Sequence, residues 1–296
     1  MKKFIENKKN DAFFLAVLAA ICGGSVVVSA KIVLEVFNPF TVVLIRFFFA
    51  TLFLLPFVLN KNELTINNLK RYSWIGIIGS LNPILLFIAL PFTLASVSPL
   101  IYASVPAMTS IYLFLTIREK PSLKQIVGIL IGFFGVTTIV ILPLIEKSID
   151  ISALKGNILI VFAAIAFMFY GILSKKAQQK HSISPIALTF YFSFYTFLIS
   201  IPFSGFELMR TGVPNTIEIK HIFNGIFIGV VGTGIFYLAY QYALKLGSTI
   251  AASLFTYIQP IATILMASFI LGEKITLTFV IGGILAVVGA RLASSK

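Results

Sequence analysis

Charged residues are scarce in this sequence of 296 residues, since Asp, Glu, Lys and Arg together make up 11% of it. A soluble domain contains about 25% charged residues, whereas 58% of this chain is hydrophobic. A chain of this composition lacks the polar side chains needed to cover a surface that faces water. The composition therefore excludes a soluble globular domain and a disordered chain, and it indicates a membrane protein.

Cysteine, histidine and acidic residues are also rare. Cys22 is the single cysteine, so the chain can form no internal disulfide and contains no CxxC motif. There is no GxxxxGK[ST], HExxH or GxSxG motif, and the two histidines, His181 and His221, lie between apolar runs. No Asp or Glu lies in the core of an apolar run, so a buried proton carrier is not evident. We therefore expect no cofactor, no metal, no ATP drive and no enzyme activity.

The net charge is strongly positive, with 23 Lys and Arg residues against 10 Asp and Glu residues. In a soluble protein this excess would suggest nucleic acid. Here the basic residues lie in short connections between apolar runs, which is the distribution that membrane topology demands. We therefore expect the lipid bilayer, and not nucleic acid, as the partner of this chain.

Ten apolar runs are long enough to cross a bilayer, which takes about 20 mostly apolar residues. They cover residues 12–30, 40–59, 74–94, 98–117, 126–145, 154–174, 185–203, 222–244, 248–271 and 277–293. The first run follows basic residues as a signal peptide does, but it is longer than the usual apolar core of 7–15 residues. The sequence therefore predicts an all-α integral membrane protein with ten transmembrane helices.

The basic residues also predict the orientation. If the N-terminus lies in the cytoplasm, 16 of the 23 Lys and Arg residues lie on the cytoplasmic side and 6 on the other side, with Arg46 inside a span. An excess of basic residues marks the cytoplasmic side. We expect both termini in the cytoplasm and a bacterial inner (plasma) membrane as the location.

The sequence repeats itself at a shift of 154 residues. Glu119 falls on Glu273, each followed by lysine, and Pro106 falls on Pro260. Gly128 likewise falls on a glycine of the second half. Agreement of this whole set by chance is improbable, so the chain contains two related halves.

Each half, residues 12–145 and 154–293, holds five of the predicted spans. An odd number of spans gives the second half the opposite orientation in the membrane. Inverted repeats of this kind are the design of many secondary transporters, because the same arrangement used twice upside down gives two states of similar energy. A channel, a receptor or a membrane enzyme has less need of this property.

Each half ends in a proline, a Glu-Lys pair thirteen residues later and a last span that carries glycines. This pattern resembles the EamA family of the drug/metabolite transporter superfamily. Arg46 early in the second span and Gly23-Gly24 in the first are similar to that family as well, although the tryptophan often found in the first span is missing. The resemblance covers about residues 12–293. It implies a ten-helix fold with a central cavity lined by spans 1, 3, 4, 6, 8 and 9, and with spans 5 and 10 at the periphery.

Arg46 is the only permanent charge well inside a span. A charge at that depth is costly and must face protein or a wet cavity. One interpretation is that Arg46 contacts a carboxylate or phosphate of a substrate. The other is a structural arginine that snorkels or binds helix-end carbonyl groups.

The two prolines of the repeat lie in the middle of spans 4 and 9. A proline inside a helix removes a hydrogen bond and frees the carbonyl group four residues earlier, here at Tyr102 and Thr256. Pro106 and Pro260 therefore predict two kinked helices that act as gates, unless the kinks are only static features of the packing.

The two glutamates of the repeat lie at helix ends, where we expect structural roles. Ser122 with Gln125 predicts a capping box for the fifth span, and Thr276 predicts the N-cap of the tenth.

Polar side chains inside the spans must find partners within the bundle, either other helices or a substrate. The candidate substrate-binding residues are Ser25, Ser29, Arg46, Asn82, Tyr102, Thr109, Tyr170, Tyr237, Gln241, Thr256, Tyr257 and Gln259, with Pro106 and Pro260 as gating residues.

The function that the sequence predicts is a secondary transporter of a small organic metabolite such as an amino acid, working by alternating access. Export is the expected direction, by analogy with the family alone. The alternatives are a membrane-embedded enzyme or lipid-handling protein, and a receptor or scaffold that transports nothing. Whether the chain is a monomer or a homodimer stays open.

Overall fold

The computed structural model describes residues 2–117, 122–145, 151–181, 183–246 and 255–294. The described part of the chain is helical, without a strand. Its elements are α1 (Lys2–Leu34), α2 (Pro39–Asn60), α3 (Ile66–Ala89), η1 (Leu90–Phe92), α4 (Val97–Tyr102), α5 (Val105–Ile117), α6 (Leu123–Ile145), α7 (Ile151–His181), α8 (Pro185–Thr211), α9 (Ile219–Gly229), the π-helix η2 (Val230–Ile235), α10 (Phe236–Leu246), α12 (Phe255–Leu271) and α13 (Leu277–Ser294).

Eight helical segments are long and apolar enough to cross a membrane, and α12 and α13 are shorter apolar helices. The fourth segment joins α4 to α5, and the eighth joins α9, η2 and α10. The eight segments and the two shorter helices fall on the ten predicted spans. The prediction of an all-α, multi-pass membrane protein is confirmed.

Several helices begin where the sequence supplies a capping side chain. The backbone N–H of Ser122 donates to Gln125, and the N–H of Gln125 donates to the Ser122 hydroxyl, at 2.8 and 3.3 Å. The hydroxyl of Thr276 accepts from the N–H of Phe279 at 3.3 Å. Both predicted caps are therefore confirmed, and each satisfies N–H groups that have no partner inside the helix.

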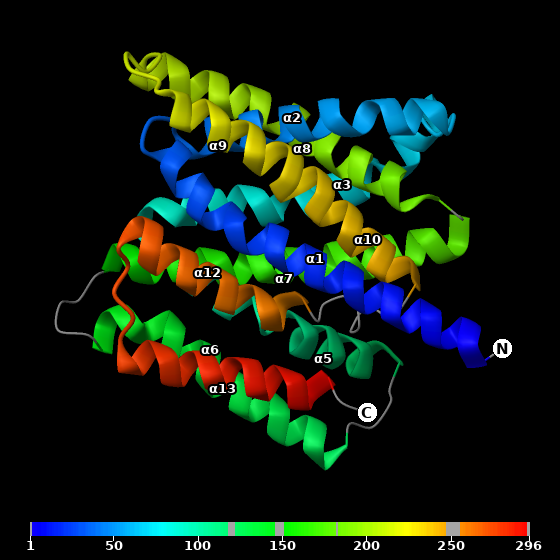
Figure 1. Ribbon diagram of the computed structural model, residues 1–296, viewed down its shortest axis with the longest axis vertical. Helices are drawn as coiled ribbons and strands as arrows, with labels where there is room; N and C mark the ends of the chain where they lie inside the picture. Colours follow the sequence, from blue (N-terminus) through cyan, green and yellow to red (C-terminus); the bar gives the residue numbers. More distant parts are fainter. Residues whose placement is uncertain (1, 118–121, 146–150, 182, 247–254, 295–296) are drawn as a thin grey trace.

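The helices are arranged in layers (Figure 1). The pair α6 and α13 lies at one end of the molecule, α2 and α8 lie at the other, and α1 and α7 pass between them. α1 begins and α13 ends on the same side of the bundle, as an even number of spans requires.

Glycines bring α6 and α13 into contact along their backbones. A β-carbon at Gly289 would lie 2.1 Å from the backbone nitrogen of Gly132, and one at Gly135 would lie 2.3 Å from the nitrogen of Ala286. Only residues without a side chain permit such an approach. The small-residue faces of these two spans are thus used within the chain, at the periphery of the bundle.

The contacts between helices repeat when the two halves are exchanged. α7 packs along α3 and along α4 and α5, while α1 packs along α9, η2 and α10 and along α12. The predicted repeat relates α1 to α7, α3 to the α9–α10 segment, and α4–α5 to α12. Each half therefore supplies one long central helix that packs against spans of the other half.

Carboxylates link the ends of α2 and α8. Glu207, near the end of α8, accepts from the backbone N–H groups of Phe40 and Thr41 at 3.0 and 2.8 Å. Glu63, just after α2, accepts from the N–H of Ser184 at 3.0 Å and from its hydroxyl. A negative charge at a helix N-terminus is favourable because it meets free N–H groups and the positive end of the helix dipole. The two antiparallel helices therefore hold each other at both ends.

Glu273 makes a similar connection between the halves. Its carboxylate accepts from the N–H groups of Ala95 and Ser96 at 2.6 and 3.1 Å and from the Ser96 hydroxyl at 2.7 Å. Lys31 lies 3.7 Å from the same carboxylate and donates to the carbonyl group of Thr93 at 2.5 Å. We call these bonds to Ala95 and Ser96 the Glu273 link. The structural role predicted for Glu273 is confirmed, although the helix it caps is α4 and not its own; Glu119 lies outside the described residues.

Candidate functional site

A cavity lies between the two halves, with walls from α1, α2, α3, α4, α7, η2, α10 and α12. These elements belong to spans 1, 2, 3, 4, 6, 8 and 9, and α6 and α13 take no part. Five predicted site residues line it: Arg46, Asn82, Tyr102, Tyr237 and Gln259. Its volume of about 40 Å³ holds only a few water molecules. The cavity in this structure is therefore too small for an organic solute.

Arg46 extends from α2 to the π-helix η2. Its Nε donates to the hydroxyl of Thr233 at 2.5 Å, and its Nη2 donates to the carbonyl group of Gly232 at 3.0 Å. The wide turn also carries a bond from the Thr233 hydroxyl to the carbonyl group of Ile228 at 3.0 Å. A π-helix leaves its carbonyl groups poorly paired, and such turns occur often at functional sites. Arg46 thus makes the bonds expected of a structural arginine and lines the cavity as well.

The positive charge of Arg46 has no anionic partner in the described part of the chain. The side chain is 3% exposed, and the four ion pairs between described residues involve Lys31, Lys220 and His221. The rings of Phe47 and Phe87 lie 5.4 and 5.2 Å from the guanidinium carbon, which offsets part of the cost of burial. The remaining cost is that of a buried, unpaired cation.

Asn82 connects four helices. Its Nδ2 donates to the hydroxyl of Tyr102 and, at 2.9 Å, to the carbonyl group of Ala163, while its Oδ1 accepts from the hydroxyl of Tyr237 at 3.0 Å. Among the described residues nothing accepts the proton of the Tyr102 hydroxyl. The amide therefore joins α3 and α4 to α7 and α10, and it leaves a hydrogen-bond donor in the cavity.

Gln259 and the glycine pair of the first span form the contact between α1 and α12. Gln259 donates to the carbonyl group of Gly23 at 3.1 Å, and Thr263 donates to that of Gly24 at 3.0 Å. A β-carbon at Gly24 would lie 2.9 Å from that of Ala262. The glycines therefore allow α12 to come close enough to hydrogen-bond the backbone of α1.

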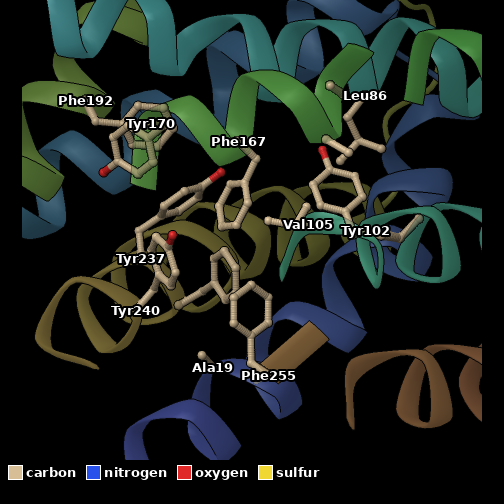
Figure 2. Close-up of a cluster of buried hydrophobic side chains, with 14 of the residues drawn as sticks. Ala19, Leu86, Tyr102, Val105, Phe167, Tyr170, Phe192, Tyr237, Tyr240 and Phe255 are labelled. Carbon is tan, nitrogen blue, oxygen red and sulfur yellow. The ribbon is translucent and has the colours of Figure 1, made fainter. Parts of the chain in front are cut away.

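Aromatic rings gather around Phe167 of α7 (Figure 2). Tyr240 and Phe255 lie 5.0 and 6.0 Å from it between ring centroids, and Tyr237 and Tyr102 lie 6.3 and 5.9 Å from it. We call these five rings the aromatic cluster. Tyr240 lies seven residues beyond the partner of Arg46 on the eighth span, about 10 Å along a helix. Tyr240 thus lies away from the arginine, whereas Tyr102 and Tyr237 line the cavity together with it.

Two predicted site residues lie beyond the aromatic cluster, in a polar network that joins α7 to α10. Gln241 donates to the hydroxyl groups of Tyr170 and Ser174 at 2.6 and 3.0 Å, and its Oε1 accepts from Gln178 at 2.7 Å. Neither Tyr170 nor Gln241 lines the cavity.

The other five predicted site residues lie outside the wall of this cavity. Ser25 and Thr109 donate to carbonyl groups of their own helices, at 2.9 and 2.8 Å. Ser29 and Thr256 are buried in the packing, and Tyr257 lies in an apolar groove between α12 and α13. These groups find hydrogen-bond partners or packing partners within the bundle.

The prolines behave differently in the two halves. Pro106 is the second residue of α5, and α4 has already ended at Tyr102. The helix is thus interrupted at Tyr102, where Pro106 predicts it, but the interruption divides the fourth span into two helices and does not only kink a continuous one. Pro260 lies inside α12, as predicted, and lines the groove that contains Tyr257. Neither proline lines the cavity.

Several wall residues were missed by the sequence analysis. Phe167, Phe236 and Phe255 are apolar, and in a chain with 30 phenylalanines nothing in the sequence marks these three. Ser98 could have been found, since it precedes Tyr102 by four residues and so shares its face of the span.

A family model for the EamA-like transporter family matches the chain twice, over residues 11–141 and 154–295. The chain belongs to the EamA-like transporter family. As a member of that family it is a transporter embedded in the membrane.

Curated relatives of this EamA-like chain are named as transporters. An "uncharacterized transporter" of Clostridium kluyveri is 28% identical over 98% of this chain and 94% of its own length. "Uncharacterized transporter YetK" of Bacillus subtilis is 27% identical over 93% of this chain and 85% of its own length. A protein crystal structure, 15% identical, superposes with a TM-score of 0.67 over 95% of this chain and 96% of the other chain, which shows a shared fold.

Proposed function

We propose that this protein is a secondary transporter that carries a small organic metabolite with a carboxylate group, such as an amino acid, by alternating access. The observation that carries the proposal is the buried guanidinium of Arg46. It lies in the wall of a cavity between the two halves of the chain and has no carboxylate partner among the described residues. A bound anion would offset the cost of that charge.

The two ends of the cavity suit the two ends of such a substrate. Arg46 uses Nε and Nη2 in its bonds to η2, so Nη1 can donate to a carboxylate, and the Tyr102 hydroxyl supplies a second donor. The rings of Phe167, Phe236 and Phe255 line the cavity and would contact the organic part of the substrate, and ring faces can also hold an ammonium group. A carboxylate bound by charged donors gains about 1.5–3 kcal/mol for each such hydrogen bond.

The small size of the cavity supports alternating access. Since the space holds only a few water molecules, the helices around it must separate to admit an amino acid. The divided span of α4 and α5 and the proline-containing α12 occupy corresponding positions in the two halves, and we propose that they move. Pro106 and Pro260 keep their proposed role as gating residues.

We place the protein in a bacterial inner membrane with both termini in the cytoplasm. The excess of basic residues on one side supports this orientation, and relatives come from Clostridium kluyveri and Bacillus subtilis. Export is the proposed direction by family analogy. We propose transport without chemical conversion of the solute.

The proposal is tested by counterflow in proteoliposomes. Vesicles are loaded with a pool of unlabelled amino acids, nucleosides, sugar phosphates and polyamines, and the entry of each labelled compound is followed. We expect saturable entry of a carboxylate-bearing compound. Its decarboxylated amine should enter with at least about tenfold lower apparent affinity, as the loss of one charge-assisted hydrogen bond requires.

Arg46→Lys and Arg46→Gln refine the test. Arg46→Lys keeps the charge and should retain part of the transport, whereas Arg46→Gln should lose the preference for the carboxylate. Equal entry of the acid and its amine in the unmodified protein would refute the role of Arg46 in recognition. Absence of entry of every compound, also under imposed ion gradients and with a wider panel, would refute transport.

A further inference from the structure

A second pocket opens at the end of the bundle where α3 begins and α7 ends. Its volume is about 210 Å³, and Arg71, Trp74, Lys176, Lys180 and His181 are among the residues that line it. Arg71 precedes Asn82 by eleven residues on α3, so the pocket lies about 16 Å along that helix from the central cavity. In the orientation proposed above, it faces the cytoplasmic leaflet of the membrane.

The charge of this pocket is one-sided. Arg71, Lys176 and Lys180 carry fixed positive charges, and the described lining contains no carboxylate. Lys176 and Lys180 lie four residues apart on one face of α7, where like charges repel. The carboxylate of Glu63 is not available to them, because it accepts two hydrogen bonds from Ser184.

The helix dipoles explain only half of this arrangement. Lys180 and His181 lie in the last turn of α7, where cations are favourable. Arg71 lies near the start of α3, which has no acidic residue in its first turn, so its charge adds to the positive end of that dipole. An anion held between the two helix ends would be attracted to the positive end of the α3 dipole, and it would reduce the repulsion between Lys176 and Lys180 on α7.

The pocket also has an aromatic and apolar side. Trp74 is 46% exposed, while Tyr72 is buried, with its ring stacked on Tyr191 at 5.7 Å and set edge-on to His181 at 6.4 Å. Exposed tryptophan beside buried tyrosine is typical of the level of lipid headgroups. A free phosphate compound would use only the cations, whereas a phospholipid would use the cations and the indole together.

We propose that this pocket binds the headgroup of an anionic phospholipid. The phosphodiester lies among Arg71, Lys176 and Lys180, and the glycerol and the upper acyl chain lie against Trp74. Basic pockets between transmembrane helices on the cytoplasmic side bind anionic headgroups in this way. The proposal depends on the composition of this pocket and not on the transported solute.

Trp74 is the single tryptophan of the chain, so its fluorescence reports on this pocket alone. The full chain is reconstituted in nanodiscs of phosphatidylcholine that contain an equal, small mole fraction of either brominated phosphatidylglycerol or brominated phosphatidylcholine. Bromine quenches an indole only at close contact. We expect the anionic brominated lipid to quench Trp74 at a mole fraction at least about 25-fold lower than the zwitterionic one, since two lysines contribute about fivefold each.

Lys176→Gln with Lys180→Gln should remove most of this preference. A lysine near an anionic surface contributes about 1 kcal/mol, which is about fivefold in the half-quenching mole fraction for each lysine. Lys61→Gln with Lys245→Gln is the matched control, because both of these lysines are exposed and lie outside the pocket. All four side chains lie on the surface, and the single variant Lys180→Gln provides a milder test if the double variant folds poorly.

Glycerol 3-phosphate separates the lipid from a free phosphate compound. Preferential quenching that survives millimolar glycerol 3-phosphate and is lost only in the pocket variants supports the proposal. Equal quenching by both brominated lipids overturns it. If the control variant, Lys61→Gln with Lys245→Gln, loses the preference for the anionic lipid as much as the pocket variant does, the preference comes from diffuse surface charge. That result also overturns the proposal. Displacement of the lipid by glycerol 3-phosphate would assign the pocket to a soluble phosphate and overturn the lipid assignment.

Discussion

The Glu273 link is expected to hold the cavity closed at the end where α4 begins. Glu273 follows α12, whereas Ala95 and Ser96 precede α4, so the link joins the second half of the chain to the first. α4 then supplies Ser98 and Tyr102 to the cavity wall. Opening at this end requires α4 to move away from α12, and the link must break.

The loss of free energy expected for Glu273→Gln follows from the bonds that the variant side chain would keep and those it would lose. With its oxygen toward Ser96, the amide retains the bonds at 3.1 and 2.7 Å and loses the bond to the N–H of Ala95 at 2.6 Å. It also loses the negative charge that faces the N-terminus of α4 and Lys31 at 3.7 Å. One charge-assisted hydrogen bond contributes about 1.5–3 kcal/mol and the dipole about 0.3–1 kcal/mol. Glu273→Gln should therefore weaken the closed state by about 2–4 kcal/mol.

Thiol labelling measures this change. Cys22 is the single cysteine, so Cys22→Ala with Ser98→Cys leaves one thiol in the cavity wall. Ser98 is 1% exposed in this structure, so a water-soluble maleimide should react with a cysteine at this position when α4 moves away from α12. A shift of about 2 kcal/mol raises the open population, and thus the labelling rate in detergent, by about thirtyfold.

Glu35→Gln is the matched control for this experiment. Glu35 pairs with Lys220 at 3.2 Å on an exposed surface, with both side chains about half exposed. Exposed pairs contribute little, so the labelling rate should stay unchanged. If Glu273→Gln labels no faster than Glu35→Gln, the link does not hold the cavity closed and the reasoning fails.

Three further predictions concern packing and transport. Gly289→Val should lower the free energy of unfolding by more than about 3 kcal/mol, because its β-carbon would meet the backbone of α6, whereas Gly205→Ala, with open space around it, should not lower the melting temperature. Asn82→Leu should abolish counterflow while the protein is still inserted, because Tyr237 loses its acceptor; unchanged flux would contradict a role for Asn82. Pro260→Ala and Pro106→Ala should slow the exchange of solute across the membrane with little effect on folding. If both variants exchange solute as fast as the unmodified protein, the prolines serve only in packing.

Much of the fold could be predicted from the sequence because hydrophobic length and turn chemistry are local signals. The ten apolar runs and the caps at Ser122 and Thr276 depend on neighbouring residues alone. The interruption of the fourth span after Tyr102 also has a local signal, which is Pro106 four residues later. The π-helix at Gly232 was missed, because it depends on what packs against it: Arg46 bonds to the wide turn of η2 from another helix. Such distant partners leave no local pattern.

The sequence indicated which types of residue form the site, but it indicated less well which individual residues face the cavity. Polar side chains inside spans are rare enough to be found, and Asn82, Tyr102 and Tyr237 do meet across three helices. The sequence does not give the rotation of each helix about its axis, however, so Thr109 and Ser25 were included although they bond to their own helices. Phe167 has no distinguishing feature in the sequence.

The glycine contact between α6 and α13 has a consequence for biosynthesis. The face of α6 that carries Gly128, Gly132 and Gly135 is covered by residues near the end of the chain, among them Ala286 and Ala293. Since α6 ends at Ile145 and α13 ends at Ser294, about 150 residues are synthesised after α6 before its partner is complete, which takes roughly 8–30 s at about 5–20 residues per second. During that interval its bare glycine stripe faces lipid or the insertion machinery. Ribosome stalling before α13 would leave an incomplete bundle in which these three glycines of α6 lack their partner helix.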